Sequence, residues 1–104
     1  MERHRTFGEH LRQLREEADL TLREVGAKVD IDPSLLAKIE RGFRQPTMEF
    51  INDIADFYNA NGKDLLEEWL SDRIAHKVLE AGADLNILKV AEEKAVYIKS
   101  KRNG

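Results

Sequence analysis

The stretch from Thr21 to Gly42 restricts the fold more than any other part of the chain, because it contains two helix start signals separated by a turn. Thr21 and Glu24 form a capping box, in which each side chain pairs with a backbone N–H that the helix leaves free. Asp32 and Pro33 form the second signal, since aspartate is a good N-cap and proline fits the first helical position. Gly42 is expected to end the second helix in a left-handed conformation. The stretch therefore predicts two short helices joined by a tight turn.

Two helices this short are unstable alone, because nucleating a helix is costly and short helices bury little surface. The flanks supply helices to pack on: we expect them after Thr6 and Thr47, over residues 63–81, and from an Asp84 cap to about Lys101. A chain of 104 residues has room for one domain with a modest core and an appendage.

The two-helix stretch and its flanks, FGEHLRQLRE before and FRQPTMEFINDIADFY after, resemble the bacterial XRE family of helix-turn-helix regulators, which includes the phage repressor and Cro proteins. The resemblance runs from Phe7 to Leu70, and its most specific blocks are LREEADLTLREV and SLLAKIERGFRQPT. It implies an all-α fold: a five-helix repressor/Cro-like helix-turn-helix domain in residues 1–70, and an added C-terminal helix in the extension 71–104, which we expect to dimerise. It also implies sequence-specific DNA binding and regulation of transcription.

Three positions depart from the family pattern. Asp30 stands where the turn usually has glycine, Asp32 replaces the usual serine N-cap, and Ala37 replaces a small polar residue. Aspartate enters the left-handed region more readily than most residues. We therefore expect the turn at Asp30 to form.

The resemblance also places four residues at the positions that contact bases in the major groove: Pro33, Ser34, Ala37 and Lys38. Lys38 can donate to guanine O6 and N7, and Ser34 can pair with several bases. Leu35 lies next to these four residues, and Pro33 and Leu35 offer apolar contact to a thymine methyl group. The alternative for Ser34 and Lys38 is an ordinary solvated helix face. We interpret Asp32 as a cap first, and as an acceptor from cytosine N4 only second.

A second group of residues is expected to contact DNA phosphates, which position a protein without specifying sequence. The candidates are Thr21, Arg23, Arg41, Arg44 and Gln45. For Arg23, plain solvent exposure is an equal alternative. Arg44 has the stronger case, because it lies in the loop that follows the groove helix in this family.

Arg15 and Glu40 match two positions that form an ion pair in relatives. Glu40 follows the inward-facing Ile39 and precedes the end of the groove helix. We expect a partly buried bidentate pair that orients this helix.

The net charge of −3 conceals an uneven distribution. Residues 1–46 carry nine Lys/Arg and nine Asp/Glu, residues 47–81 carry three and eight, and residues 82–104 carry five and three. The acidic excess thus lies outside the expected DNA-reading part, where a local basic face matters more than the total charge. The absence of cysteine excludes disulfides and thiolate chemistry, which fits a cytoplasmic protein. No apolar run approaches the ~20 residues that span a bilayer, so we expect no membrane contact.

Nothing in the sequence indicates an enzyme, a cofactor or a metal site. His4, His10 and His76 are scattered and have no metal-ligand spacing. There is no glycine-rich phosphate loop and no nucleophile elbow around a serine. We expect a protein without catalytic activity.

The last expected helix carries two apolar stripes, more than a small domain needs. One stripe contains Leu85, Leu88, Ala91, Ala95 and Ile98. The other contains Ile87, Val90 and Tyr97, which with Trp69 are the residues that we expect at a dimer interface. A second copy of the chain is the simplest partner for the stripe left over. The alternative is that both C-terminal helices only enlarge the core.

Two functions follow. The first is a homodimeric transcription regulator, a repressor or controller, that reads the major groove of an inverted-repeat operator. Its half-sites are expected about one helical turn (~10 bp), or a multiple of it, apart. The second is a protein-interaction module, such as a DNA-binding antitoxin that neutralises a partner protein.

Overall fold

The computed structural model describes residues 4–103, and all the secondary structure in this range is α-helical. The helices are α1 (Phe7–Glu17), α2 (Leu22–Lys28), α3 (Pro33–Glu40), α4 (Met48–Tyr58), α5 (Gly62–Glu80) and α6 (Asn86–Asn103). The predicted all-α fold is confirmed. Two compact units divide the chain, Met1–Asp72 and Arg73–Gly104, so the first holds α1 to α4 and the start of α5.

Local side-chain caps explain where the first four helices begin. Thr6 and Thr21 each form the expected capping box, with Glu9 and Glu24 as the reciprocal partners. The Thr6 hydroxyl accepts from the Glu9 N–H at 3.1 Å, and the Glu9 carboxylate accepts from the Thr6 N–H at 2.8 Å. Thr47 caps α4 by accepting from the backbone of its third residue at 3.0 Å. These bonds satisfy N–H groups that a helix cannot satisfy by itself.

Left-handed residues end the helices and form the turns. Asp30, which stands in the turn between α2 and α3, has φ 55°, as expected for aspartate at this position. Gly42 has φ 82° directly after α3. Its N–H donates to the Ile39 carbonyl at 3.1 Å, and the Phe43 N–H donates to the Lys38 carbonyl at 2.8 Å. This pair of bonds is a Schellman motif, which fixes the direction in which the chain leaves α3.

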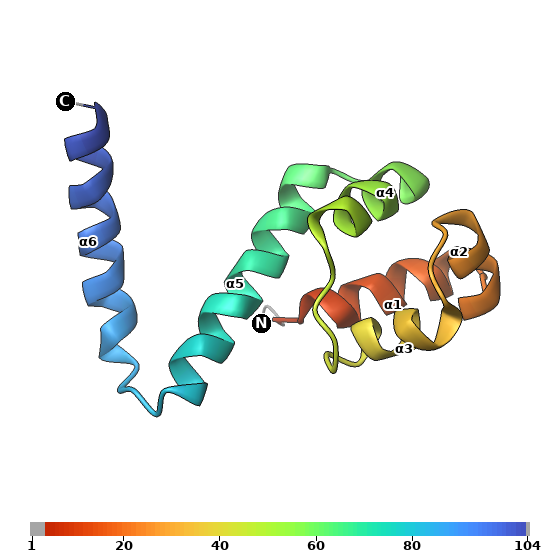
Figure 1. Ribbon diagram of the computed structural model, residues 1–104, viewed down its shortest axis with the longest axis horizontal. Coiled ribbons are helices and arrows are strands. Elements are labelled where there is room, and N and C mark those ends of the chain that lie inside the picture. The colour runs from red at the N-terminus through yellow and green to blue at the C-terminus, as the bar shows by residue number, and fades with distance from the viewer. Residues whose placement is uncertain (1–3, 104) are drawn as a thin grey trace. The chain divides into compact units, whose positions relative to one another are not determined.

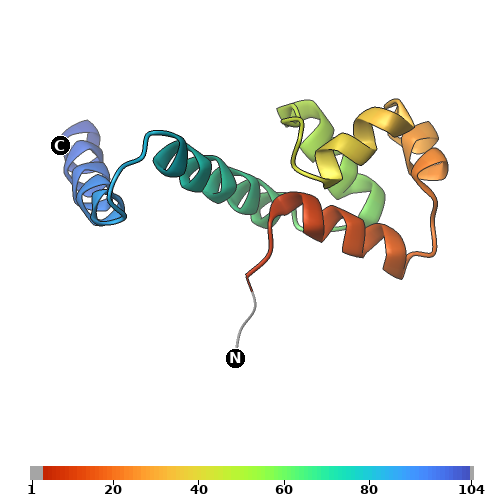
Figure 2. The same ribbon diagram turned by 90° about the horizontal axis from the view of Figure 1, so that it is seen from below.

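The described residues of the first unit enclose an apolar core. Helix α3 packs against both α1 and α2 (Figures 1 and 2). The buried apolar side chains are Phe7, Leu11, Val25, Leu36, Ile39, Phe50, Ile51, Ile54, Ala55 and Leu65. Removing this apolar surface from water is the main stabilising contribution, and it holds one face of α3 inward.

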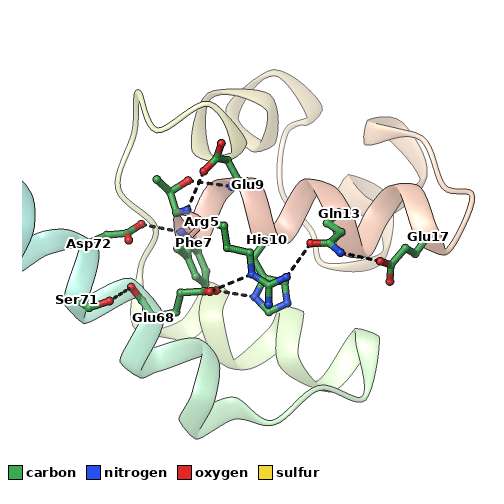
Figure 3. Close-up of polar contacts among 10 residues, drawn as sticks. Arg5, Phe7, Glu9, His10, Gln13, Glu17, Glu68, Ser71 and Asp72 are labelled. Carbon is green, nitrogen blue, oxygen red and sulfur yellow. Dashed lines mark hydrogen bonds and ion pairs between the residues drawn. The ribbon is translucent and has the colours of Figure 1, made fainter. Parts of the chain in front are cut away.

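A polar network joins the start of α1 to the part of α5 that belongs to the first unit (Figure 3). The Phe7 N–H donates to Asp72 Oδ2 at 2.7 Å. The Glu68 carboxylate lies 2.6 Å from His10 Nδ1 and 3.3 Å from Arg5 Nε. The network therefore adds directional contacts to the apolar packing of α5.

The second unit contains the end of α5, a turn and α6. Gly82 has φ 66° in the turn, and the Asp84 carboxylate accepts from the Asn86 N–H at 2.9 Å, so the expected breaker and cap are present. Every residue of α6 is exposed within the single chain. Within residues 4–103, no helix has both the length and the apolar character needed to cross a membrane.

Candidate nucleic-acid interface

Helix α3 has two distinct faces. Leu36, Ile39 and Glu40 are buried, whereas Ser34 and Lys38 are exposed. The other two expected base-contact residues, Pro33 and Ala37, are partly buried. Leu35, from which we expected an apolar contact to a base, instead packs partly against the core. Because its inner face is buried, α3 is held in place, and its exposed face can enter a groove without a change in the orientation of the helix.

Asp32 acts as the cap of α3. Its carboxylate accepts from the Ser34 N–H at 2.8 Å and also from the Ser34 hydroxyl. The hydroxyl bond is the main cause that lowers the pKa of Asp32, followed by the bond from the backbone N–H. Ser34 must therefore exchange its bond to Asp32 before its hydroxyl can donate to a base.

Arg15 of α1 and Glu40 at the end of α3 form a bidentate pair. Arg15 Nε lies 2.9 Å from Glu40 Oε2, and Arg15 Nη2 lies 3.0 Å from Glu40 Oε1. A third bond runs from Arg15 Nη1 to the Leu20 carbonyl at 3.1 Å. The hydrogen bond to Glu40 raises the pKa of Arg15, against the opposing effect of burial. The pair ties the last turn of α3 to α1 and to the loop that precedes α2.

Gly8 allows α1 and α3 to approach each other closely, which nothing in the sequence alone indicated. A Cβ atom at this position would lie 2.4 Å from the Glu40 carbonyl oxygen and 2.6 Å from the Ile39 carbonyl oxygen. A glycine within a helical pattern has several possible reasons, and the close approach to α3 can be identified only once the position of the partner helix is known.

The expected phosphate contacts fall into two groups. Thr21 and Arg23 are exposed at the start of α2, where the capping box already uses the hydroxyl and N–H of Thr21. Arg41, Arg44 and Gln45 are exposed in the segment that leads from α3 to α4. The second group therefore lies in the exposed segment that follows the last residue of α3.

A hollow of about 600 Å³ lies beside α3, and α1 forms its other wall. Its lining residues are Thr6, Glu9, Arg12, Arg15, Leu22, Ala37, Glu40 and Arg41. Arg12 was absent from our candidates, because an arginine on an exposed helix face carries no signal in the sequence alone. Arg12 lines the α1 wall of the hollow, and Ala37 and Arg41 line the wall formed by the α3 segment.

A sequence profile described as "Helix-turn-helix domain" matches residues 6–69, which is more than half of the chain. The chain belongs to this helix-turn-helix family. A relative named "HTH-type transcriptional regulator DdrOP3", from Deinococcus deserti, is 34% identical over 79 residues, which are 74% of this chain. The chain spans 61% of that relative's length. The family resemblance that we drew from the sequence is thereby confirmed.

Two solved structures share the helix-turn-helix fold at low sequence identity. The clp gene regulator ClgR from Corynebacterium glutamicum has a TM-score of 0.55 and 24% identity, covering 85% of this chain and 88% of its own. A structure titled "SinR protein/SinI protein complex" has a TM-score of 0.55 and 20% identity, covering 91% and 99%. At these identities the likeness supports the fold and nothing further.

The residues that we expected at a dimer interface of this helix-turn-helix protein lie in different surroundings. Trp69 is partly buried and packs against the core of the first unit. Ile87, Val90 and Tyr97 are exposed on α6. Their apolar surface is therefore available to a partner, whereas Trp69 is partly covered by the core of its own unit.

Proposed function

We propose that this helix-turn-helix protein is a homodimeric regulator of transcription that reads an inverted-repeat operator in the major groove through α3. The observation that carries the proposal is the two-sided character of α3. Ser34 and Lys38 point outward, while the core and the Arg15–Glu40 pair fix the opposite side. A rigid helix with an exposed polar face is what major-groove reading needs.

The roles of the residues follow from their chemistry. Lys38 donates to guanine O6 and N7, and Ser34 pairs with a base edge once it leaves Asp32. Pro33 and Ala37 offer small apolar contacts, as to a thymine methyl group. Arg41, Arg44 and Gln45 hold phosphates after the end of α3, and Arg23 with Thr21 does so at the start of α2. These phosphate contacts set the register of α3 without reading sequence.

Dimerisation is assigned to the second unit. Helix α6 has 18 residues and no buried side chain, whereas helices in proteins gain most of their stability from packing one face against a partner. A second copy that covers Ile87, Val90 and Tyr97 stabilises α6. It also supplies the second reading helix, with half-sites about one helical turn (~10 bp), or a multiple of it, apart.

A second candidate function is a DNA-binding antitoxin or a similar interaction module, in which α6 covers a different protein. The same exposed side chains of α6 favour it. In both cases the protein needs no cofactor and no catalytic group. In both cases it also acts where the DNA is, which in this bacterial family is the cytoplasm.

The test is a gel shift with labelled fragments from the region upstream of the protein's own gene. If the proposal holds, the labelled fragment gives a shifted band. An excess of the same fragment without label removes this band, whereas an excess of random DNA does not. A pull-down runs in parallel. No shift with any fragment contradicts the first function, and together with a stable complex with another protein it supports an interaction module. A shift together with such a complex supports a DNA-binding antitoxin.

A further inference from the structure

The hollow beside α3 borders the face of α3 that we assign to base reading, because Ala37 lines it. Ala37 and Arg41 of the α3 segment line it on one side, and Glu9 and Arg12 of α1 line it on the other. Ala37 belongs to the face that we assign to base reading. The wall opposite Ala37 is therefore next to the backbone that borders the groove.

The charges around the hollow are not equivalent. Arg15 and Glu40 are engaged with each other, with side chains only 15% and 6% exposed. The carboxylate of Glu9 accepts from the Thr6 N–H in the capping box of α1. The side chains of these three residues therefore already have partners within the protein, which stabilise α1 and its packing against α3.

Arg12 and Arg41 are the cations at the hollow that remain free to exchange partners. The ion pair of Arg12 joins it to Glu16 at 3.5 Å, and the Arg12 side chain is 64% exposed. An exposed pair of this kind contributes little and is readily replaced. Among residues 4–103, no hydrogen bond or ion pair engages the side chain of Arg41.

We propose that Arg12 is a phosphate-contacting residue, which together with Arg41 holds one phosphodiester strand of double-stranded DNA over the hollow between α1 and α3. This inference rests on the proposed function, and it adds α1 to the elements that position the protein on DNA. The planar guanidinium group matches the oxygens of a phosphate in a bidentate geometry, which makes arginine suited to this contact.

The test measures DNA affinity by fluorescence anisotropy between about 50 and about 200 mM salt, for specific and for random duplexes. The variants are Arg12→Gln, Arg12→Lys and the control Lys28→Gln. Lys28 is also exposed and in the first unit, but it lines a separate hollow with Asp30 and Asp53. Thermal melts followed by circular dichroism verify that every variant folds.

Removing one phosphate contact is expected to reduce the slope of log affinity against log salt by about 0.9. We expect this change in Arg12→Gln on both duplexes, most of the slope to return in Arg12→Lys, and no change in Lys28→Gln. An unchanged slope in Arg12→Gln, or an equal loss in Lys28→Gln, overturns the role of Arg12 and leaves the proposed function standing. A wild-type protein that binds neither duplex overturns both.

Discussion

Arg15 and Glu40 are joined by two parallel hydrogen bonds of 2.9 and 3.0 Å, so a side chain of α1 holds the last residue of α3. The Glu40 side chain is nearly inaccessible to water. A carboxylate in such a place must be paired, because leaving it unpaired costs much more than the pair itself contributes. The bond therefore makes the orientation of α3 depend on α1.

The first prediction concerns this pair. Arg15→Ala and Glu40→Ala are each expected to lower the free energy of unfolding by ~3–5 kcal/mol, the cost of leaving a buried charge without its partner. The double variant should cost much less than the sum of the two. Urea unfolding of all four proteins completes the double-mutant cycle. Additive losses contradict a coupled pair.

The second prediction concerns the approach of α1 to α3 at Gly8. Gly8→Ala places a methyl group 2.4 Å from a backbone carbonyl oxygen of Glu40, so a helix has to shift. We expect a loss of at least about 1–3 kcal/mol in the free energy of unfolding, as for overpacked cores.

Gly62→Ala is the matched control for Gly8→Ala. Its new methyl group meets Ala55 Cβ at 3.8 Å, which is an ordinary contact. Replacing a helical glycine by alanine should be neutral or stabilising by up to about 1 kcal/mol. Equal effects of the two substitutions on thermal unfolding would contradict the close approach.

The third prediction concerns pH. The bonds from Ser34 lower the pKa of Asp32 in the folded protein, so the folded state releases this proton more readily than the unfolded state. The stabilisation is fully present above the ordinary aspartate pKa of about 4, and it is lost as the pH falls through the lower, folded-state value.

Asp32→Asn isolates this effect, because asparagine is also a good N-cap but does not titrate. The difference in free energy of unfolding between the wild type and Asp32→Asn should be constant near neutral pH and should change only below about pH 4. Chemical unfolding at a series of pH values measures it. A difference that changes instead between pH 6 and pH 8 would assign the titration to another group.

The fourth prediction concerns α6. Val90→Glu places a charge in the stripe of Ile87 and Tyr97 and should raise the dimer dissociation constant at least about tenfold, since burying a valine contributes about 1.5 kcal/mol or more. Val96→Glu is the control. Val96 is 65% exposed, and its helix neighbours three and four residues away are all polar: Glu92, Glu93, Lys99 and Ser100.

Sedimentation equilibrium measures both variants of α6. We also expect the helix content to fall when the wild-type protein is diluted below its dissociation constant, because every described residue of α6 is exposed. A wild-type protein that stays monomeric at all concentrations contradicts the dimer.

Much of the fold was predictable from the sequence, because helix starts depend on local chemistry. Thr6, Thr21, Asp32 and Thr47 each cap a helix through a bond to a residue two or three positions away. Such bonds need no knowledge of the rest of the molecule. The turn at Asp30 follows from the same local reasoning.

Other parts of the site depend on which helix faces meet, and periodicity does not give this. The role of Gly8 depends on the path of α3, and the hollow at Arg12 depends on the angle between two helices. His10 lies against Glu68, 58 residues further along the chain. Trp69 belongs to an apolar stripe, but only the structure shows that the first unit already covers much of it. The pairing of Arg15 with Glu40 was accessible only through the family resemblance.

The measurement that tests the central claim most directly is the ratio of specific to random DNA affinity for Lys38→Ala and Arg44→Ala. If α3 reads bases, Lys38→Ala should lower this ratio by the equivalent of about 1–3 kcal/mol, while Arg44→Ala weakens both affinities alike and leaves the ratio unchanged. A Lys38→Ala protein that keeps the full wild-type ratio contradicts reading through the outer face of α3.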